Sequence, residues 1–338
     1  MIKITDSPDI KRWSEFVYNH PKGNVFQTPE MAEVYRRTKN YEPITLAAVD
    51  TETGDVVAVL LAVIIKVRDD ILKHFSTRSV IHGGPLFVEG EKGRDAIKIL
   101  LEHYDKIVQK KVLYTLVRNM YDTSEISDAF NSKSYKYEDH LNYFIDLNQS
   151  VNELWTRLYK SRRNGINRAK RRGVIIEEVI NSDVIPILYE LLKETYMNAK
   201  LPLADISLFQ SIFEILSQRN MAKIFIANWE NTYIGTIIIT SYRNTIFDWY
   251  AGAPRRYSRL CPNDILAWHA IEWGAKNGYC IFDFGGAGNP KEEYGVREFK
   301  KQFGGKLVNF GRYIKVYSPV KMKIAGKGFS IYRKLFIR

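Results

Sequence analysis

The chain has 338 residues, of which 45% are hydrophobic and 26% are charged, a composition typical of a folded protein rather than a disordered one. This length suits two domains of about 150 residues better than a single core. Fifty Lys and Arg residues against 38 Asp and Glu residues leave a net charge of +12. The surplus favours polyanionic partners such as RNA, an anionic membrane surface or phosphorylated molecules.

Several classes of protein are disfavoured by the same sequence. The longest apolar stretch, residues 56–67, is interrupted by Lys66 and is about half the length needed to span a bilayer. Charged residues occupy the N-terminal segment where a signal peptide would be apolar, so a cytoplasmic location is expected. Only Cys261 and Cys280 occur, and the six histidines show no metal-ligand spacing. We therefore expect no metal site and no cofactor.

Helices and strands alternate through the first half of the chain. Thr28 followed by Pro29 is typical of a helix start, because Thr caps the first turn and Pro fits its first position. A Thr-Gly-Asp turn joins two apolar runs and predicts a hairpin. The elements expected are helices over 10–19 and 29–38, strands over 44–50 and 56–67, a helix over 93–109, and strands over 112–117 and 142–147.

The second half repeats this order. The elements expected are helices over 151–172, 184–199 and 207–219, a hairpin of strands 221–229 and 233–242 turning at Asn231, a strand over 245–250, a helix over 262–277 and a strand over 279–284. A helix pair, hairpin, strand, helix and strand thus occur twice. The pattern predicts an α/β fold made of two similar tandem domains, with the boundary near Asp146.

The run from Asp283 to Gly305 holds the densest group of candidate binding residues. Its predicted strand ends in Gly285 and Gly286, where glycine allows φ > 0 and where we expect free backbone N–H groups to face a ligand. Phe299 and Lys300 precede a second glycine pair and would add an aromatic wall and a mobile cation. Such a cation can stabilise an oxyanion or a leaving alkoxide, although a plain surface lysine remains an alternative.

Residues 246–313, which contain FDWYAGAPRRYSRLCPNDIL and DFGGAGNPKEEYGVREFKKQFGG, closely resemble the C-terminal domain of the FemABX peptidyltransferases. The resemblance is strong from Trp155 to Arg312 and weak before Asp146. It implies two tandem GNAT-like (acyl-CoA N-acyltransferase-like) domains. The expected activity is the transfer of an amino acid from aminoacyl-tRNA to an amine of a cell-wall peptide precursor or a similar acceptor.

The resemblance also implies the domain limits and several site residues. The first domain would span 1–145, with 317–338 returning to it, and the second 146–316. Phe299-Lys300 matches a family Phe-Lys pair whose lysine is linked to catalysis. Tyr250 matches a substrate-contacting tyrosine, with a core aromatic as the alternative. Arg297 and Asn263 lie on neighbouring loops and could hold phosphate, but for each a helix cap or a plain surface position is the simpler interpretation, and Asn263 stands at a predicted helix start.

Two segments depart from the family pattern. Between Tyr114 and Asp122, both candidate substrate-binding residues, Asn119 stands about where the family has an aspartate near the substrate, so the general base is open. Asn198 stands about where a family arginine contacts the acceptor. The identities of the acceptor and of the transferred amino acid are therefore also open.

Basic residues gather in the predicted helix 151–172 and in the C-terminal tail. Successive cations on several faces of one helix would repel one another without an anion, so we expect this helix to bind tRNA through Arg162, Arg163, Arg171 and Arg172. A solvated surface remains the simpler alternative. The tail, 317–338, mixes cations with apolar residues and could rest on a membrane surface or pack on the first domain.

Two other functions compete with aminoacyl transfer. A CoA-dependent GNAT-type N-acyltransferase would hold pyrophosphate at a glycine-rich turn that opens a helix. Here the equivalent turn, RYSRLCPNDIL, contains no glycine, and Pro262 removes one N–H group. A non-catalytic RNA-binding module is compatible with the charge, but no aromatic nucleic-acid platform supports it.

Overall fold

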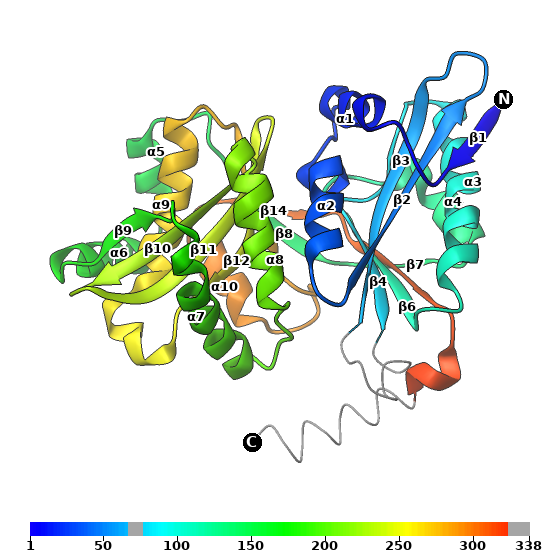
Figure 1. Cartoon of the computed structure of the whole chain (residues 1–338). Coiled ribbons are helices and arrows are strands. Elements are labelled where there is room, and N and C mark those ends of the chain that lie inside the picture. The colour runs from blue at the N-terminus through cyan, green and yellow to red at the C-terminus, as the bar shows by residue number, and fades with distance from the viewer. Residues whose placement is uncertain (67–76, 324–338) are drawn as a thin grey trace. The chain divides into compact units, whose positions relative to one another are not determined.

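A computed structural model describes residues 1–66 and 77–323 (Figure 1). The chain divides into two compact units, one formed by Met1–Asp139 with the segment from Phe310, and the other by His140–Asn309. Each unit has its own sheet and its own buried core. Within the described residues, no helix is long and apolar enough to cross a membrane.

The sheet of the first unit has, in the described residues, the order β1-β2-β3-β4-β6-β15-β7, with β5 paired to β3. All its neighbours are antiparallel except β4 and β6, which are parallel. The helix α3 belongs to this unit, and its residues Leu100, Leu101 and Tyr104 are completely buried. Its strands are β1 (Ile2–Thr5), β2 (Tyr41–Asp50), β3 (Val56–Ile65), β4 (Arg78–His82), β5 (Leu86–Phe87), β6 (Tyr114–Arg118), β7 (Lys136–Glu138) and β15 (Arg312–Val316), and its main helices are α1 (Ile10–Asn19), α2 (Pro29–Arg37), α3 (Glu91–Val108) and α4 (Ser127–Ser132).

The second unit has a sheet of order β14-β8-β13-β12-β11-β10-β9. Its core joins Ile246 and Phe282 of the central strands to Trp268 and Ile271 of the helix α9. Its strands are β8 (Leu141–Asp146), β9 (Ile175–Glu178), β10 (Ala222–Trp229), β11 (Thr232–Tyr242), β12 (Thr245–Gly252), β13 (Ile281–Gly286) and β14 (Lys306–Asn309), and its helices are α5 (Val151–Arg157), α6 (Lys160–Arg171), α7 (Ile185–Asn198), α8 (Ile206–Ser211), α9 (Pro262–Lys276) and α10 (Gly295–Lys301).

The strands β12 and β13 form the parallel pair of the second unit, as strands joined by a helix such as α9 can. Their pairing covers only Thr245–Phe247 of β12 and ends at Phe247 opposite Asp283, although both strands continue. On the other edge of β12, Trp249 is an extra residue in a bulge, because Ile238 faces Tyr250 and Ile239 faces Asp248. A bulge bends a strand and redirects its side chains, so β12 leaves β13 beyond Phe247.

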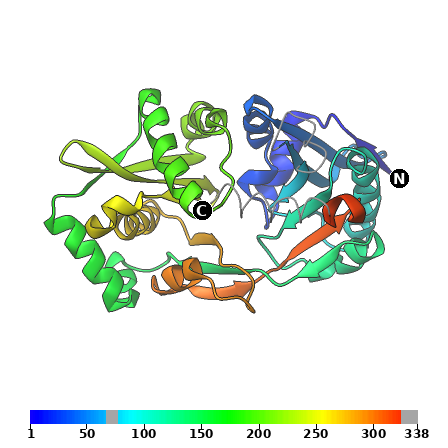
Figure 2. The ribbon, with the colours of Figure 1, turned by 90° about the horizontal axis from the view of Figure 1, so that it is seen from below.

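The domain boundaries differ from those expected. The strand at 141–146 pairs with β13 and β14 in the second sheet and does not close the first unit. Conversely, β15 pairs with β6 and β7 in the first sheet, where Figure 2 shows it as an orange-red strand. The return to the first unit therefore begins at Phe310 rather than at Tyr317. The apolar part of the tail, 324–338, lies outside the described residues.

Two expected helices are also broken. The basic segment 151–172 forms two helices, because Leu158 and Tyr159 both adopt extended ψ angles between α5 and α6. The segment 207–219 begins as α8 and continues as a π turn and then a 3-10 turn. By contrast, Thr28 caps α2 by accepting a hydrogen bond from the N–H of Met31, as its sequence predicts.

Candidate active site

Lys300 lies in α10, beside the end of β13. Its Nζ donates hydrogen bonds to the carbonyl oxygen of Gly286, at 3.0 Å, and to that of Phe284. It also lies 5.6 Å from the centroid of the Phe284 ring. An ammonium group has three protons, and these two carbonyls account for two of them. Within the described part of the chain, the third has no hydrogen-bond acceptor and can meet a bound molecule.

Asp283 is the carboxylate behind these carbonyls and is completely buried. Its Oδ1 accepts hydrogen bonds from the N–H of Gly285, at 2.7 Å, and from Nδ2 of Asn142, at 3.3 Å. Its Oδ2 has no hydrogen-bond partner among the described residues. Burial raises the pKa of Asp283 to about 7, against the lowering effects of the Gly285 N–H and of Lys300. This carboxyl group is therefore held partly protonated near neutral pH.

A second carboxylate, Asp248, follows Phe247, the last residue of β12 that pairs with β13, and is half-buried. Burial raises the pKa of Asp248 to about 6, and the positive charge of Lys300 opposes that rise. The same burial lowers the pKa of Lys300, while Asp248 and Asp283 raise it. One amine and two carboxyl groups thus titrate together where β12 and β13 separate.

Two expectations for this segment are wrong. The N–H of Gly285 is not free for a ligand, because Asp283 accepts its hydrogen bond, and the groups that converge here are carbonyl oxygens. Lys300 is not a mobile cation, because those carbonyls hold it. Gly285 does adopt a positive φ of 68°, and a Cβ at this position would lie 3.2 Å from the backbone oxygen of Asp248. Glycine therefore allows the backbones of β13 and β12 to approach closely.

The two predicted aromatic residues pack against their neighbours. Tyr250 is half-buried, with its ring 5.0 Å from Phe209 of α8 and 5.9 Å from Tyr196 of α7. Phe299 packs on the core and lies 5.1 Å from Phe303. Phe299 thus packs α10 onto the core and does not form the aromatic wall of a binding site that was expected.

The two residues expected to hold phosphate, Arg297 and Asn263, have different environments. Arg297 donates from Nε to the carbonyl of Ala287, at 2.8 Å, and from its terminal nitrogen to the carbonyl of Asn289. It therefore fastens the loop after β13 to α10. Asn263 is exposed in the first turn of α9, whose N-cap position is occupied by Cys261.

The four arginines predicted to bind tRNA have different environments. Arg162 pairs with Asp264 in the first turn of α9, and their side chains are 22% and 12% exposed. Its guanidinium also lies 5.2 Å from the centroid of the Phe299 ring. The charge of Arg162 is thus already matched within the protein, which corrects its expected role. Arg163 donates to the carbonyl of Thr156 and Arg172 to that of Arg259, whereas Arg171 lies exposed in the last turn of α6.

Tyr114 and Asp122 belong to the first unit. Tyr114 begins β6 and pairs with Val316 of β15. Asp122 accepts a hydrogen bond from the N–H of Ser124 at 2.9 Å and so serves the local backbone. Asn119 is buried and donates from Nδ2 to the carbonyl of Phe310 at 2.9 Å, which ties the returning chain to the end of β6.

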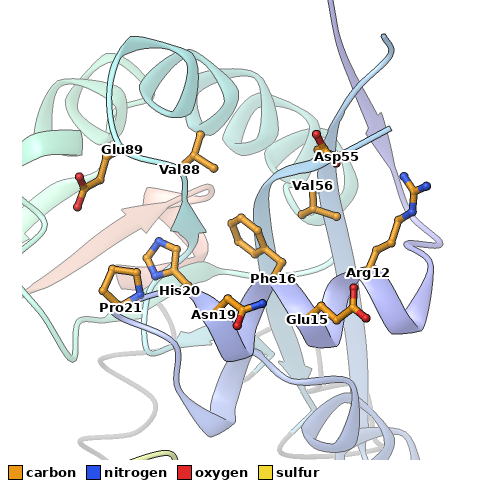
Figure 3. A pocket seen from close by; sticks show the side chains of 10 residues that line it. All are labelled: Arg12, Glu15, Phe16, Asn19, His20, Pro21, Asp55, Val56, Val88 and Glu89. Carbon is orange, nitrogen blue, oxygen red and sulfur yellow. The ribbon is translucent and has the colours of Figure 1, made fainter. Parts of the chain in front are cut away.

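The first unit also contains a hollow of about 660 Å³ between α1 and the start of β3, shown in Figure 3. Phe16, Val56 and Val88 give it an apolar surface, and Glu15 and Glu89 give it negative charge. None of the residues predicted for the site lines it.

The sequence did not single out Asp248 or Asn142. Asp248 stands in the run FDWY two residues before Tyr250, but its nearness to Lys300 depends on the strand register. Asn142 reaches Asp283 from β8, which is 141 positions away in the chain. A polar residue in an otherwise apolar strand was the one available signal for either residue.

Comparisons with known proteins agree on a fold. Residues 157–301 match the family described as an acetyltransferase (GNAT) domain. The crystal structure of FemX superposes with a TM-score of 0.69 at 15% identity, covering 98% of this chain and 99% of that chain. The structure of L-PGS from Bacillus licheniformis gives a TM-score of 0.58 at 15% identity, covering 99% of both chains. No curated protein sequence matches the chain.

A third similar structure also contains two GNAT domains in tandem. A tandem GNAT protein from the clavulanic acid biosynthesis pathway superposes with a TM-score of 0.61 at 10% identity, covering 94% of this chain and 99% of that chain. The protein therefore has a GNAT-type acyltransferase fold built from two α/β units. Its similarity to FemX supports a Fem-like fold.

Proposed function

We propose that the protein is an aminoacyltransferase that moves an amino acid from aminoacyl-tRNA to an amine, with a cell-wall peptide precursor as the acceptor class favoured by the resemblance to FemABX enzymes. The observation that carries the proposal is Lys300, an ammonium held by two carbonyls at the point where the parallel strands separate. The fold shared with FemX and L-PGS over almost the whole chain supports it.

The chemistry follows from that geometry. The acceptor amine attacks the ester carbonyl of the charged tRNA, an N–C bond forms, and the C–O bond to the ribose breaks. The amine loses one proton to solvent water, and Lys300 gives its third proton to the departing ribose oxygen. A preorganised donor at developing negative charge is usually the largest single contribution to such a reaction. The two carbonyls keep that donor in place before the substrate arrives.

The start of α9 argues against CoA as the donor. Its first turn already contains the carboxylate of Asp264, paired with Arg162. A pyrophosphate bound there would find this ion pair in the first turn and, because of Pro262, one N–H group fewer. The helix start that would cradle CoA is thus occupied by side chains of the protein itself.

The test is a transfer assay in which a mixture of charged tRNAs and amine acceptors is compared with acetyl-CoA and the same acceptors. Transfer from tRNA but not from acetyl-CoA is expected. Lys300→Met should lower kcat/KM roughly 10²-fold or more, whereas Lys301→Met should leave it near the parental value, since Lys301 is exposed and lies 3.9 Å from Glu298. Activity of Lys300→Met within threefold of the parent, or transfer from acetyl-CoA alone, contradicts the proposal.

A further inference from the structure

We infer that Asp283 is the positioning residue of this site: its carboxyl group shapes the end of β13 that holds Lys300, and when ionised it helps to keep the half-buried lysine in the ammonium form. The meaning of this inference for catalysis rests on the proposed function. Its physical content does not, because both the shape and the charge can be measured without a substrate.

The first step of the argument is the geometry of the turn. Oδ1 of Asp283 accepts the N–H of Gly285, and Asn142 fixes the same oxygen from β8. This bond closes a local turn of the kind that Asp side chains make with the backbone two residues on. Within that turn Gly285 has a positive φ, and the carbonyls on either side of it, those of Phe284 and Gly286, both point to Nζ of Lys300.

The second step is the unpaired oxygen. Oδ2 of Asp283 is buried without a hydrogen-bond partner among the described residues, an arrangement that costs free energy and calls for an explanation. Asn at this position would keep the acceptor for Gly285 and remove the charge. A negative charge here stabilises the half-buried ammonium of Lys300. Asp248 and Asp283 both act in this way, against the lowering of the Lys300 pKa by burial.

The groups that bear on Lys300 come from three strands. From β13 comes Asp283, and from β12 comes Asp248, the other carboxylate that raises the pKa of Lys300. From β8 comes Asn142, which is uncharged. Asp283 differs from Asp248 in being completely buried and bonded to the backbone. Being completely buried, Asp283 acts through Lys300.

In the transfer, Lys300 donates its proton to the ribose oxygen as the C–O bond breaks and regains a proton from water before the next turnover. A lysine that has lost its charge cannot make that donation. Removing the charge of Asp283 should therefore extend the pH range in which Lys300 is neutral toward lower pH, without removing the carbonyls that hold it.

The experiment measures the reactivity of Lys300 toward a small amine-modifying reagent as a function of pH, read by peptide mass spectrometry. In Asp283→Asn the midpoint of Lys300 modification should move to lower pH. Asp146→Asn serves as the control, because Asp146 is an exposed carboxylate on β8 of the same sheet. The midpoint of Lys300 modification in this variant should equal the midpoint in the parent. In the transfer assay, the alkaline limb of the pH–rate profile of Asp283→Asn should move in the same direction.

An unchanged midpoint in Asp283→Asn overturns the inference, whether or not transfer is detected. If the parent transfers nothing from any charged tRNA, the proposed function fails, and the modification midpoint still decides the role of Asp283. If Asp283→Asn does not fold, the midpoint is read in Asp283→Ser, which removes the charge and leaves a hydroxyl that can close the same turn more weakly; an unchanged Lys300 midpoint there also overturns the inference.

Discussion

At the scale of single residues, the site depends on the charges of Lys300, Asp248 and Asp283, and only the lysine was predicted from the sequence. Resemblance singled out Lys300, and the structure brings it to the end of β13. Its carboxylate neighbours could not be predicted, because Asp248 and Asp283 are 35 positions apart and meet only through the register that sets Phe247 opposite Asp283. A chain pattern shows which residues share a strand face, but not where two parallel strands stop pairing.

The buried carboxyl group of Asp283 predicts how stability depends on pH. Its pKa in the folded protein is about 7, against an ordinary value of 3.8, so the folded state binds its proton more tightly than the unfolded state does. The contribution of the protonated Asp283 to the free energy of unfolding is fully present below about pH 4 and is lost as the pH rises to about 7. Asp283→Asn should remove this loss and raise the melting temperature relative to the parent at pH 8, with little difference at pH 4.

This pH effect is measured by thermal unfolding of both proteins between pH 4 and pH 8. The exposed control Asp146→Asn should not gain stability at pH 8, since the pKa of Asp146 is lowered, chiefly by the Asn148 N–H. An Asp283→Asn variant that is equally destabilised at every pH would show that the carboxylate is needed only for packing.

At the scale of elements, prediction succeeded where local chemistry sets the boundary. The capping residue Thr28 and the first-turn Pro29 fix the start of α2, and the apolar hairpin β2–β3 has a long pairing with one shift of register after Ala48. Short strands such as β7, β9 and β14 were missed, because three or four residues carry no reliable periodicity and their pairing is decided by distant partners. The helix break at Leu158 was not foreseen either, because the N–H of Tyr159 there donates to the carbonyl of Gln302, a partner distant in the sequence.

The helix α6 allows its two roles to be separated by mutation. Replacing Arg163, Arg171 and Arg172 with Glu should weaken RNA binding and flatten its salt dependence, since fewer phosphates are neutralised. Arg162→Ala should instead lower the melting temperature, because it leaves the mostly buried Asp264 without its partner. Filter binding of tRNA at several salt concentrations and thermal unfolding read the two effects. If the triple variant binds as the parent does, α6 is a solvated surface.

At the scale of the whole molecule, the duplication was visible in the order of elements, and the exchange of strands at the boundary was not. β8 looks like the last strand of the first half but pairs in the second sheet, while β15 returns to the first. Each of these strands is paired on both sides, so the sheet that it joins is decided by strands distant in the sequence. In the first unit, that return is secured by a polar network under α3.

The network is centred on Asp105 of α3. Lys315 of β15 pairs with its Oδ2 at 2.6 Å, and the hydroxyls of Tyr135 and Tyr317 donate to its Oδ1 at 2.8 and 2.6 Å. The side chains of Lys315 and Asp105 are only 19% and 12% exposed. Removing one partner of a largely buried pair leaves the other charge without compensation.

Asp105→Asn should therefore destabilise the first unit by about 3 kcal/mol and loosen β15 first, since two of the three contacts to Asp105 are made by Lys315 of β15 and by Tyr317 just after it. Urea unfolding gives the total, and hydrogen exchange of the β15 and β6 amides shows whether the returning strand opens below the global transition. Asp95→Asn on the same helix is the matched control, because the Asp95–Lys98 pair is about half exposed, at 52% and 47%, and should contribute less than about 1 kcal/mol. Equal effects of the two substitutions would show that the network does not hold β15 in place and that the strand returns through its backbone pairing with β6 and β7 alone.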